Sequence, residues 1–209
     1  MKLLNIIIIL ILILIGKLGQ AYPYSSYPAK AVDPEDGDTD AYLYPQALLR
    51  QLNIVSDLPD FQSYDITAEF NADVNWYFEE DEDDRIDDDQ HDFFYVATHE
   101  LIHGLGFISS WRTLLDMQFE YLTPRAKVGV ARGEDIIMGW YQMQIFDKYI
   151  QLNKTGSYLK DMGKKIMSYE NTGEMIKQDP WLEGFHLSES GQVAQEVYDL
   201  ATSGKVNLK

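Results

Sequence analysis

Two histidines four residues apart, with a glutamate directly after the first, are the residues of this chain whose types and spacing could do chemistry. They stand in HELIH, residues 99–103. On an α-helix a step of four residues turns about 400°, so both imidazoles project from nearly the same face and can share one ion. Zinc accepts histidine nitrogens at about 2.0–2.1 Å, and a catalytic zinc keeps one position for water. His99 and His103 are therefore predicted zinc ligands.

Glu100 is the predicted general base of the same site. It lies about 100° further round the helix, where it cannot easily bind the metal but can lean toward a metal-bound water. There it would take the proton of the water and later deliver it to the leaving amine. Zinc would lower the pKa of that water and polarise the scissile carbonyl. The pattern arises by chance in about one in three hundred chains of this composition, so a zinc site is favoured over an inert histidine pair.

The motif requires a helix, and the flanking residues predict one over residues 92–105. Asp92 is a good N-cap, the apolar residues of FFYVATHELIHGLGF recur at helical spacing, and Gly104 and Gly106 end the pattern. Upstream, Ile66, Ala68 and Phe70 alternate with polar residues, as in a half-buried strand.

The spacing of apolar residues elsewhere in the chain predicts further helices. A short one over residues 46–52 follows Pro45, and apolar residues repeat every three or four positions over 134–152, 158–167 and 192–201. The predicted fold class is α+β, with a mostly helical C-terminal half.

The N-terminus predicts a signal peptide over residues 1–21. Lys2 precedes an apolar run from Leu3 to Ile15, and small residues at Gly19 and Ala21 fit cleavage after Ala21. A membrane anchor is the alternative, but a span needs roughly 20 apolar residues. We therefore expect a secreted, extracellular protein without stable membrane association after cleavage.

The net charge and the amino-acid composition restrict which classes of partner and which metal ligands we expect. Removal of residues 1–21 leaves 15 basic and 34 acidic residues, a formal charge of −19, which disfavours nucleic acid and anionic lipid. The chain has no cysteine, so metal ligands must be His, Asp or Glu. Asn153-Lys154-Thr155 is a glycosylation sequon that fits export.

The expected organisation has three parts: the signal peptide, a flexible segment with one short helix over residues 22–60, and a single domain over 61–209. Residues 79–92, EEDEDDRIDDDQHD, hold ten acidic residues in fourteen. Self-repulsion favours a solvated loop there. Calcium binding is the alternative, although the spacing lacks the turn glycine of an EF-hand.

The chain resembles the zincin (HExxH) metalloprotease superfamily, and within it secreted fungal metalloprotease-like proteins with a HELxHGLGF helix. The likeness lies in ITAEFNADVNWYF at 66–78, DFFYVATHELIHGLGFISSW at 92–111 and FDKYI at 146–150. It implies a zincin-like fold, with a small mixed sheet over the active-site helix, that hydrolyses peptide or protein substrates. His99 and His103 match its zinc ligands, Glu100 its general base, and Gly106 the glycine at which the chain turns under the metal.

The third zinc ligand stays open. The metzincin pattern places a histidine at position 109, which is Ser109 here. His186 is the only histidine after the motif and is the candidate ligand that we name. Asp116, Glu120 and His91 are weaker candidates. Relatives continue beyond the point that matches Lys209, so the alternative function is a shortened, catalytically inactive secreted binding protein of the same fold.

Overall fold

The computed structural model describes residues 6–11, 16–30, 37–52, 60–79, 85–114, 121–152, 155–169 and 176–203. The chain forms two compact units, Met1–Ile108 and Ser109–Lys209. This boundary differs from the single domain expected from residue 61 onward. Both units combine small sheets with helices, so the α+β class is confirmed, and the C-terminal half carries most of the helix, as predicted.

The first unit contains seven strands and two helices within the described residues. They are β1 (Ile6–Ile11), β2 (Gly19–Pro23), β3 (Ser26–Lys30), β4 (Ala41–Pro45), α1 (Gln46–Leu52), β5 (Ile66–Asn71), β6 (Trp76–Tyr77), β7 (His91–Asp92) and α2 (Phe93–Leu105). Strand β5, helix α1 and helix α2 confirm the predictions for residues 66–70, 46–52 and 92–105.

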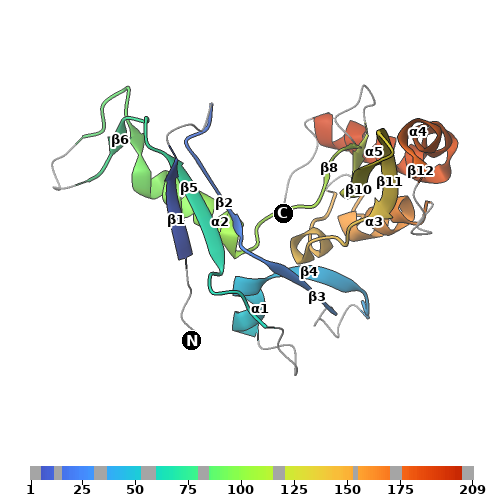
Figure 1. The fold of residues 1–209 in the computed structure, drawn as a ribbon, viewed down its shortest axis with the longest axis horizontal. Helices are drawn as coiled ribbons and strands as arrows, with labels where there is room; N and C mark the ends of the chain where they lie inside the picture. The colour runs from blue at the N-terminus through green and yellow to red at the C-terminus, as the bar shows by residue number, and fades with distance from the viewer. Residues whose placement is uncertain are drawn as a thin grey trace. The chain divides into compact units, whose positions relative to one another are not determined.

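A mixed three-stranded sheet organises this unit. Its order is β1-β5-β2, with β1 parallel and β2 antiparallel to β5. Helix α2, green in Figure 1, runs beside this sheet. Their shared core joins Ile66, Ala68 and Phe70 of β5 to Phe93 and Leu101 of α2. A small mixed sheet beside the motif helix is what the zincin resemblance implied, whereas the zincin fold itself stays a prediction.

The segment predicted to be flexible, residues 22–60, contains more order than a short helix. Strands β3 and β4 pair antiparallel, from Ser26 opposite Pro45 to Lys30 opposite Ala41. Tyr42 and Tyr44 are only 1% and 2% exposed, whereas Ala41 is exposed and Leu43 is half-buried. Their burial stabilises the hairpin, because tyrosines at every second residue pack on one face of a strand.

The second unit contains five strands, three α-helices and a short 3-10 helix within the described residues. They are β8 (Arg112–Thr113), β9 (Leu122–Thr123), β10 (Ala126–Ala131), β11 (Glu134–Trp140), η2 (Ile145–Lys148), α3 (Leu159–Met167), β12 (Ile176–Lys177), α4 (Gln178–Leu187) and α5 (Glu189–Thr202). Helices α3 and α5 confirm the predictions for residues 158–167 and 192–201.

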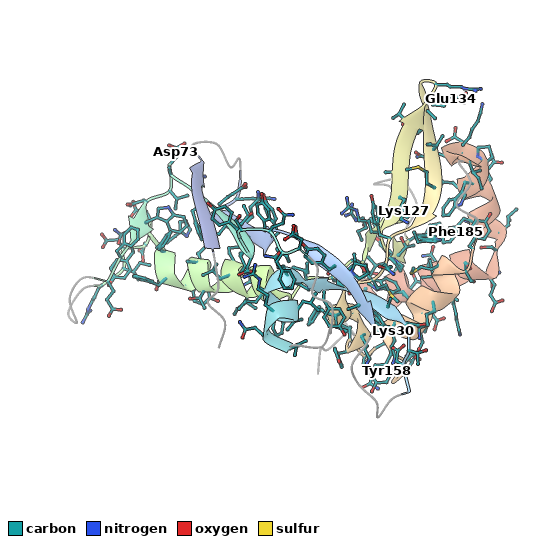
Figure 2. All side chains as sticks on the ribbon, turned by 60° about the horizontal axis from the view of Figure 1, so that its bottom comes forward. Lys30, Asp73, Lys127, Glu134, Tyr158 and Phe185 are labelled. Atoms are coloured by element: carbon teal, nitrogen blue, oxygen red, sulfur yellow. The ribbon has the colours of Figure 1, made fainter. Side chains whose placement is uncertain are left out.

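The helix predicted over residues 134–152 is wrong. Residues 134–140 form β11, which pairs with β10 through a two-residue turn at Arg132 and Gly133. Both turn residues have positive φ, 54° and 80°, as a type I′ hairpin turn requires. Figure 2 shows Glu134 at the tip of this hairpin and Lys127 at its other end.

An aromatic core holds the helices of the second unit to its sheet. Trp181 and Phe185 of α4 stack with ring centroids 4.9 Å apart, and Trp140 of β11 packs against both. Trp181 is 1% exposed and Phe185 is 0% exposed. No helix among the described residues is both long and apolar enough to cross a bilayer.

Candidate metal centre

Helix α2 carries the HELIH motif and is fixed at both ends. Asp92 caps its start, because the Asp92 side chain accepts a hydrogen bond of 2.9 Å from the Tyr95 N–H. At its far end Gly104 lies against β5 so closely that a Cβ there would stand 2.3 Å from Ile66 Cγ2. Only glycine allows this approach, which explains why Gly104 lies inside the helix rather than ending it.

The two histidines are held together as the spacing predicts. Their Nε2 atoms lie 3.2 Å apart, and their rings are nearly perpendicular at 85°. Two nitrogens that bind one tetrahedral zinc at about 2.0–2.1 Å stand about 3.3–3.4 Å from each other. The observed separation is close to that value and is also a direct hydrogen-bond distance, so the pair can share a proton or, with little rearrangement, an ion.

The chain that follows α2 orients His103. Gly106 has φ of 127° and its N–H donates to the His103 carbonyl, which turns the chain back. This brings the Phe107 carbonyl oxygen to 2.7 Å from His103 Nδ1. A carbonyl only accepts, so Nδ1 carries the proton and Nε2 presents its lone pair. A second partner of this kind commonly fixes metal-binding histidines.

Glu100 stands between the helix and the sheet. Its side chain is half-buried, and its Oε2 accepts a hydrogen bond of 3.1 Å from the backbone N–H of Ala21 in β2. No other hydrogen bond to the Glu100 side chain occurs within the described residues. One carboxylate oxygen is therefore held by the edge strand, and the other is available to a polar group near the motif.

The surface around the histidine pair is open and apolar. His99 is exposed and His103 is half-buried, so the rings reach solvent rather than a closed interior. Tyr95, Ile102 and Phe107 beside them are 74%, 42% and 58% exposed. An inert pair sealed inside the core, the alternative to a metal site, does not describe this arrangement.

Position 109, where metzincins carry a third histidine, has a different role here. The Ser109 hydroxyl donates to Asp147 Oδ1 at 2.6 Å, and the Ser110 hydroxyl and N–H donate to Asp147 Oδ2. Asp147 is fully buried and belongs to the FDKYI stretch. Burial raises the pKa of Asp147, and these hydrogen bonds oppose the rise. Hydrogen bonds to Asp147 thus join the FDKYI stretch to Ser109 and Ser110.

His186 lies on α4 in the second unit. Its Nδ1 is in hydrogen-bonding contact with the Tyr121 hydroxyl, and its side chain is exposed. The hydroxyl can donate or accept, so this contact leaves either tautomer of His186 possible. Burial raises the pKa of Tyr121, which keeps its phenol protonated at neutral pH. His186 as the third ligand stays a prediction.

The other ligand candidates divide into two groups. Asp116 and Glu120 lie outside the described residues, as do Asn153 of the sequon and residues 80–84 of the acidic loop. His91 is described and exposed in β7, with its ring near Trp76. Within the part of the chain that the structure describes, no three His, Cys, Asp or Glu side chains gather closely enough to hold a metal.

Two groups of the site are backbone atoms that side-chain patterns do not reveal. The Phe107 carbonyl and the Ala21 N–H have no residue-type signature, since any residue could supply them. The turn glycine at Gly106 was the available signal for the first group. The second depends on strand β2, of which Gly19 to Ala21 lie in the predicted signal peptide of residues 1–21.

One protein-family model matches most of the chain. The model described as SPBPB7E8-like matches residues 13–205. The chain belongs to this family. The SPBPB7E8-like match covers both units and the whole HELIH helix. It carries no statement of activity, and no link from it to the zincins is shown.

A curated relative matches a smaller part of the chain. The uncharacterized protein PB7E8.01 of Schizosaccharomyces pombe is 33% identical over 141 residues, which are 61% of this SPBPB7E8-like chain. The chain spans about a quarter of that relative, 23% of its length. No solved structure gives a significant match.

Proposed function

We propose that this SPBPB7E8-like protein is a secreted zinc-dependent metallopeptidase that hydrolyses peptide bonds with zinc-activated water. The observation that supports this most strongly is the Nε2–Nε2 distance of 3.2 Å between His99 and His103 on one helix face. The zinc would be held by these two nitrogens and by a third ligand, for which His186 is the candidate. Zinc would supply Lewis acidity toward water and the scissile carbonyl.

The residues of this chain would transfer the proton and bind the peptide. Glu100 would hold and move the proton of the attacking water through the carboxylate oxygen that β2 leaves available. The exposed side chains of Tyr95, Ile102 and Phe107 would contact apolar side chains of a peptide. Export would be directed by the apolar run of residues 3–15.

The test is hydrolysis of denatured casein by the purified protein. We expect cleavage that 1,10-phenanthroline abolishes and that added zinc restores, because a chelator removes the ion and leaves the chain intact. Serine-protease inhibitors should have no effect. Cleavage that survives full metal removal, with no metal in the protein, would exclude the proposed mechanism.

A second function is a secreted binding protein that keeps the fold without catalysis. It is favoured by one observation, the lack of a third ligand beside the histidine pair within the described residues. Two imidazoles alone bind zinc weakly, since catalytic sites ordinarily use three protein ligands. A protein that copurifies with no metal and cleaves no casein would support this function.

A further inference from the structure

Along strand β2, the backbone N–H groups point alternately toward β5 and away from it. The even-numbered residues face β5: the Leu18 carbonyl accepts from Asn71 N–H at 2.9 Å, and the Tyr24 N–H donates to the Asp65 carbonyl at 2.9 Å. Gly19, Ala21 and Pro23 are the intervening residues and turn their nitrogens outward. Pro23 has no N–H, and proline in a sheet is accepted at outward-facing edge positions.

The outward N–H of Ala21 has a partner on the motif helix. It donates to Glu100 Oε2 at 3.1 Å, across 79 residues of sequence. Ala21 is 8% exposed and lies in the core shared by the sheet and α2. A hydrogen bond to an ionised carboxylate in a partly buried place is among the stronger ones.

From this geometry we infer that the backbone N–H of Ala21 is a positioning group for Glu100, and that residues 17–24 are part of the working site. The inference rests on the proposed peptidase function. A free glutamate samples several rotamers, and fixing it in one of them costs conformational entropy. In the folded protein, the hydrogen bond from the Ala21 N–H offsets this entropy loss. The carboxylate is therefore already oriented when substrate binds.

This role conflicts with leader cleavage after Ala21. Cleavage there would remove the N–H that holds Glu100 and half of β2. The hydrogen bonds that join β2 to β5 begin at Lys17, whose carbonyl accepts from Asn71 Nδ2 at 3.2 Å. The inference therefore places the end of any removed leader before Lys17, a cut that keeps β2 and removes β1.

The first test is the N-terminus of the full chain collected from the medium of a eukaryotic secretory host. Intact mass and N-terminal sequencing would identify the first residue. We expect a chain that retains Lys17 to Tyr24. A chain that begins at Tyr22 and cleaves casein would overturn the inference, because the positioning N–H would be absent from an active protein.

The second test is Ala21→Pro, which removes the outward N–H and keeps the inward hydrogen bonds to β5. We expect kcat to fall about tenfold with KM and zinc content unchanged, and the melting temperature to fall by no more than it does in Tyr22→Pro, because each variant loses one hydrogen bond of β2. In the Glu100→Gln background the same substitution should cause no further loss. Tyr22→Pro is the matched control, because it removes an inward N–H and should lower the melting temperature.

Amide hydrogen exchange at Ala21 separates this inference from the peptidase proposal. Glu100→Ala should speed exchange at Ala21 at least tenfold, whereas Glu69→Ala should leave it unchanged. Unaltered exchange, or an active Ala21→Pro variant with wild-type kcat, would overturn the positioning role. Protected Ala21 in a protein that cleaves no peptide would instead count against the peptidase function.

Discussion

Replacing Glu100 with glutamine is expected to lower kcat for peptide hydrolysis by roughly 10²–10⁴-fold, the usual contribution of a general base. Glutamine has nearly the same shape and can still accept the Ala21 N–H through its amide oxygen, so the fold should persist. It cannot take a proton from water. Zinc content should not change, because Glu100 is not a predicted ligand.

The matched control is Glu69→Gln. Glu69 is another half-buried glutamate of the first unit, on β5, and it bonds to Gln20 and Tyr22 of β2 rather than to the motif helix. Its replacement should leave kcat within about twofold of wild type, since the Glu69 side chain has no hydrogen bond to Glu100 or to the histidine pair. Equal losses in the two variants would show that Glu100 acts through stability and not as a base.

Substitution of Gly104 by alanine should destabilise the first unit by about 1–3 kcal/mol, the usual cost of forcing a methyl group into a packed core. The new Cβ would stand 2.3 Å from Ile66 Cγ2, and Ile66 is 0% exposed, so neither group has space to move. Alanine is normally favoured over glycine inside a helix by about 1 kcal/mol. A loss of stability here would therefore oppose the intrinsic preference. Chemical denaturation monitored by circular dichroism gives the value.

The same substitution should reduce peptide hydrolysis about 10²-fold, because a shift of about 1 Å in a catalytic group has that effect. Thr98→Ala is the control, since Thr98 is exposed on the same helix and should be neutral or slightly stabilising. In the background of Ile66→Ala the cost of Gly104→Ala should nearly disappear. A stable Gly104→Ala protein with an unchanged Ile66 would contradict the close contact of helix and strand.

The local part of the site could be predicted from the sequence. Helix periodicity and the caps at Asp92 and Gly106 placed α2, and a spacing of four placed His99 beside His103, because these features depend on neighbours along the chain. The alternation at Ile66 to Phe70 likewise predicted β5. Each of these signals lies within about fifteen residues, the range over which periodicity acts.

Features that depend on distant residues could not be predicted. Residues 134–140 have apolar side chains that also suit a helix, and only pairing with β10 makes them a strand. The apolar run from Leu3 to Ile15 predicted a leader, and residues Ile6–Ile11 within it form strand β1, because hydropathy describes a leader and an apolar strand alike. The contact of Ala21 with Glu100 joins residues 79 apart and involves a backbone atom.

Zinc content of the wild-type chain and of a His99→Ala/His103→Ala variant tests the central claim most directly. Both proteins would be purified without chelator, dialysed against micromolar zinc and analysed by elemental mass spectrometry, with folding checked by circular dichroism. The account predicts one zinc per wild-type chain and none in the folded variant. Equal zinc in both proteins, or none in either, would contradict a metal centre at these two histidines.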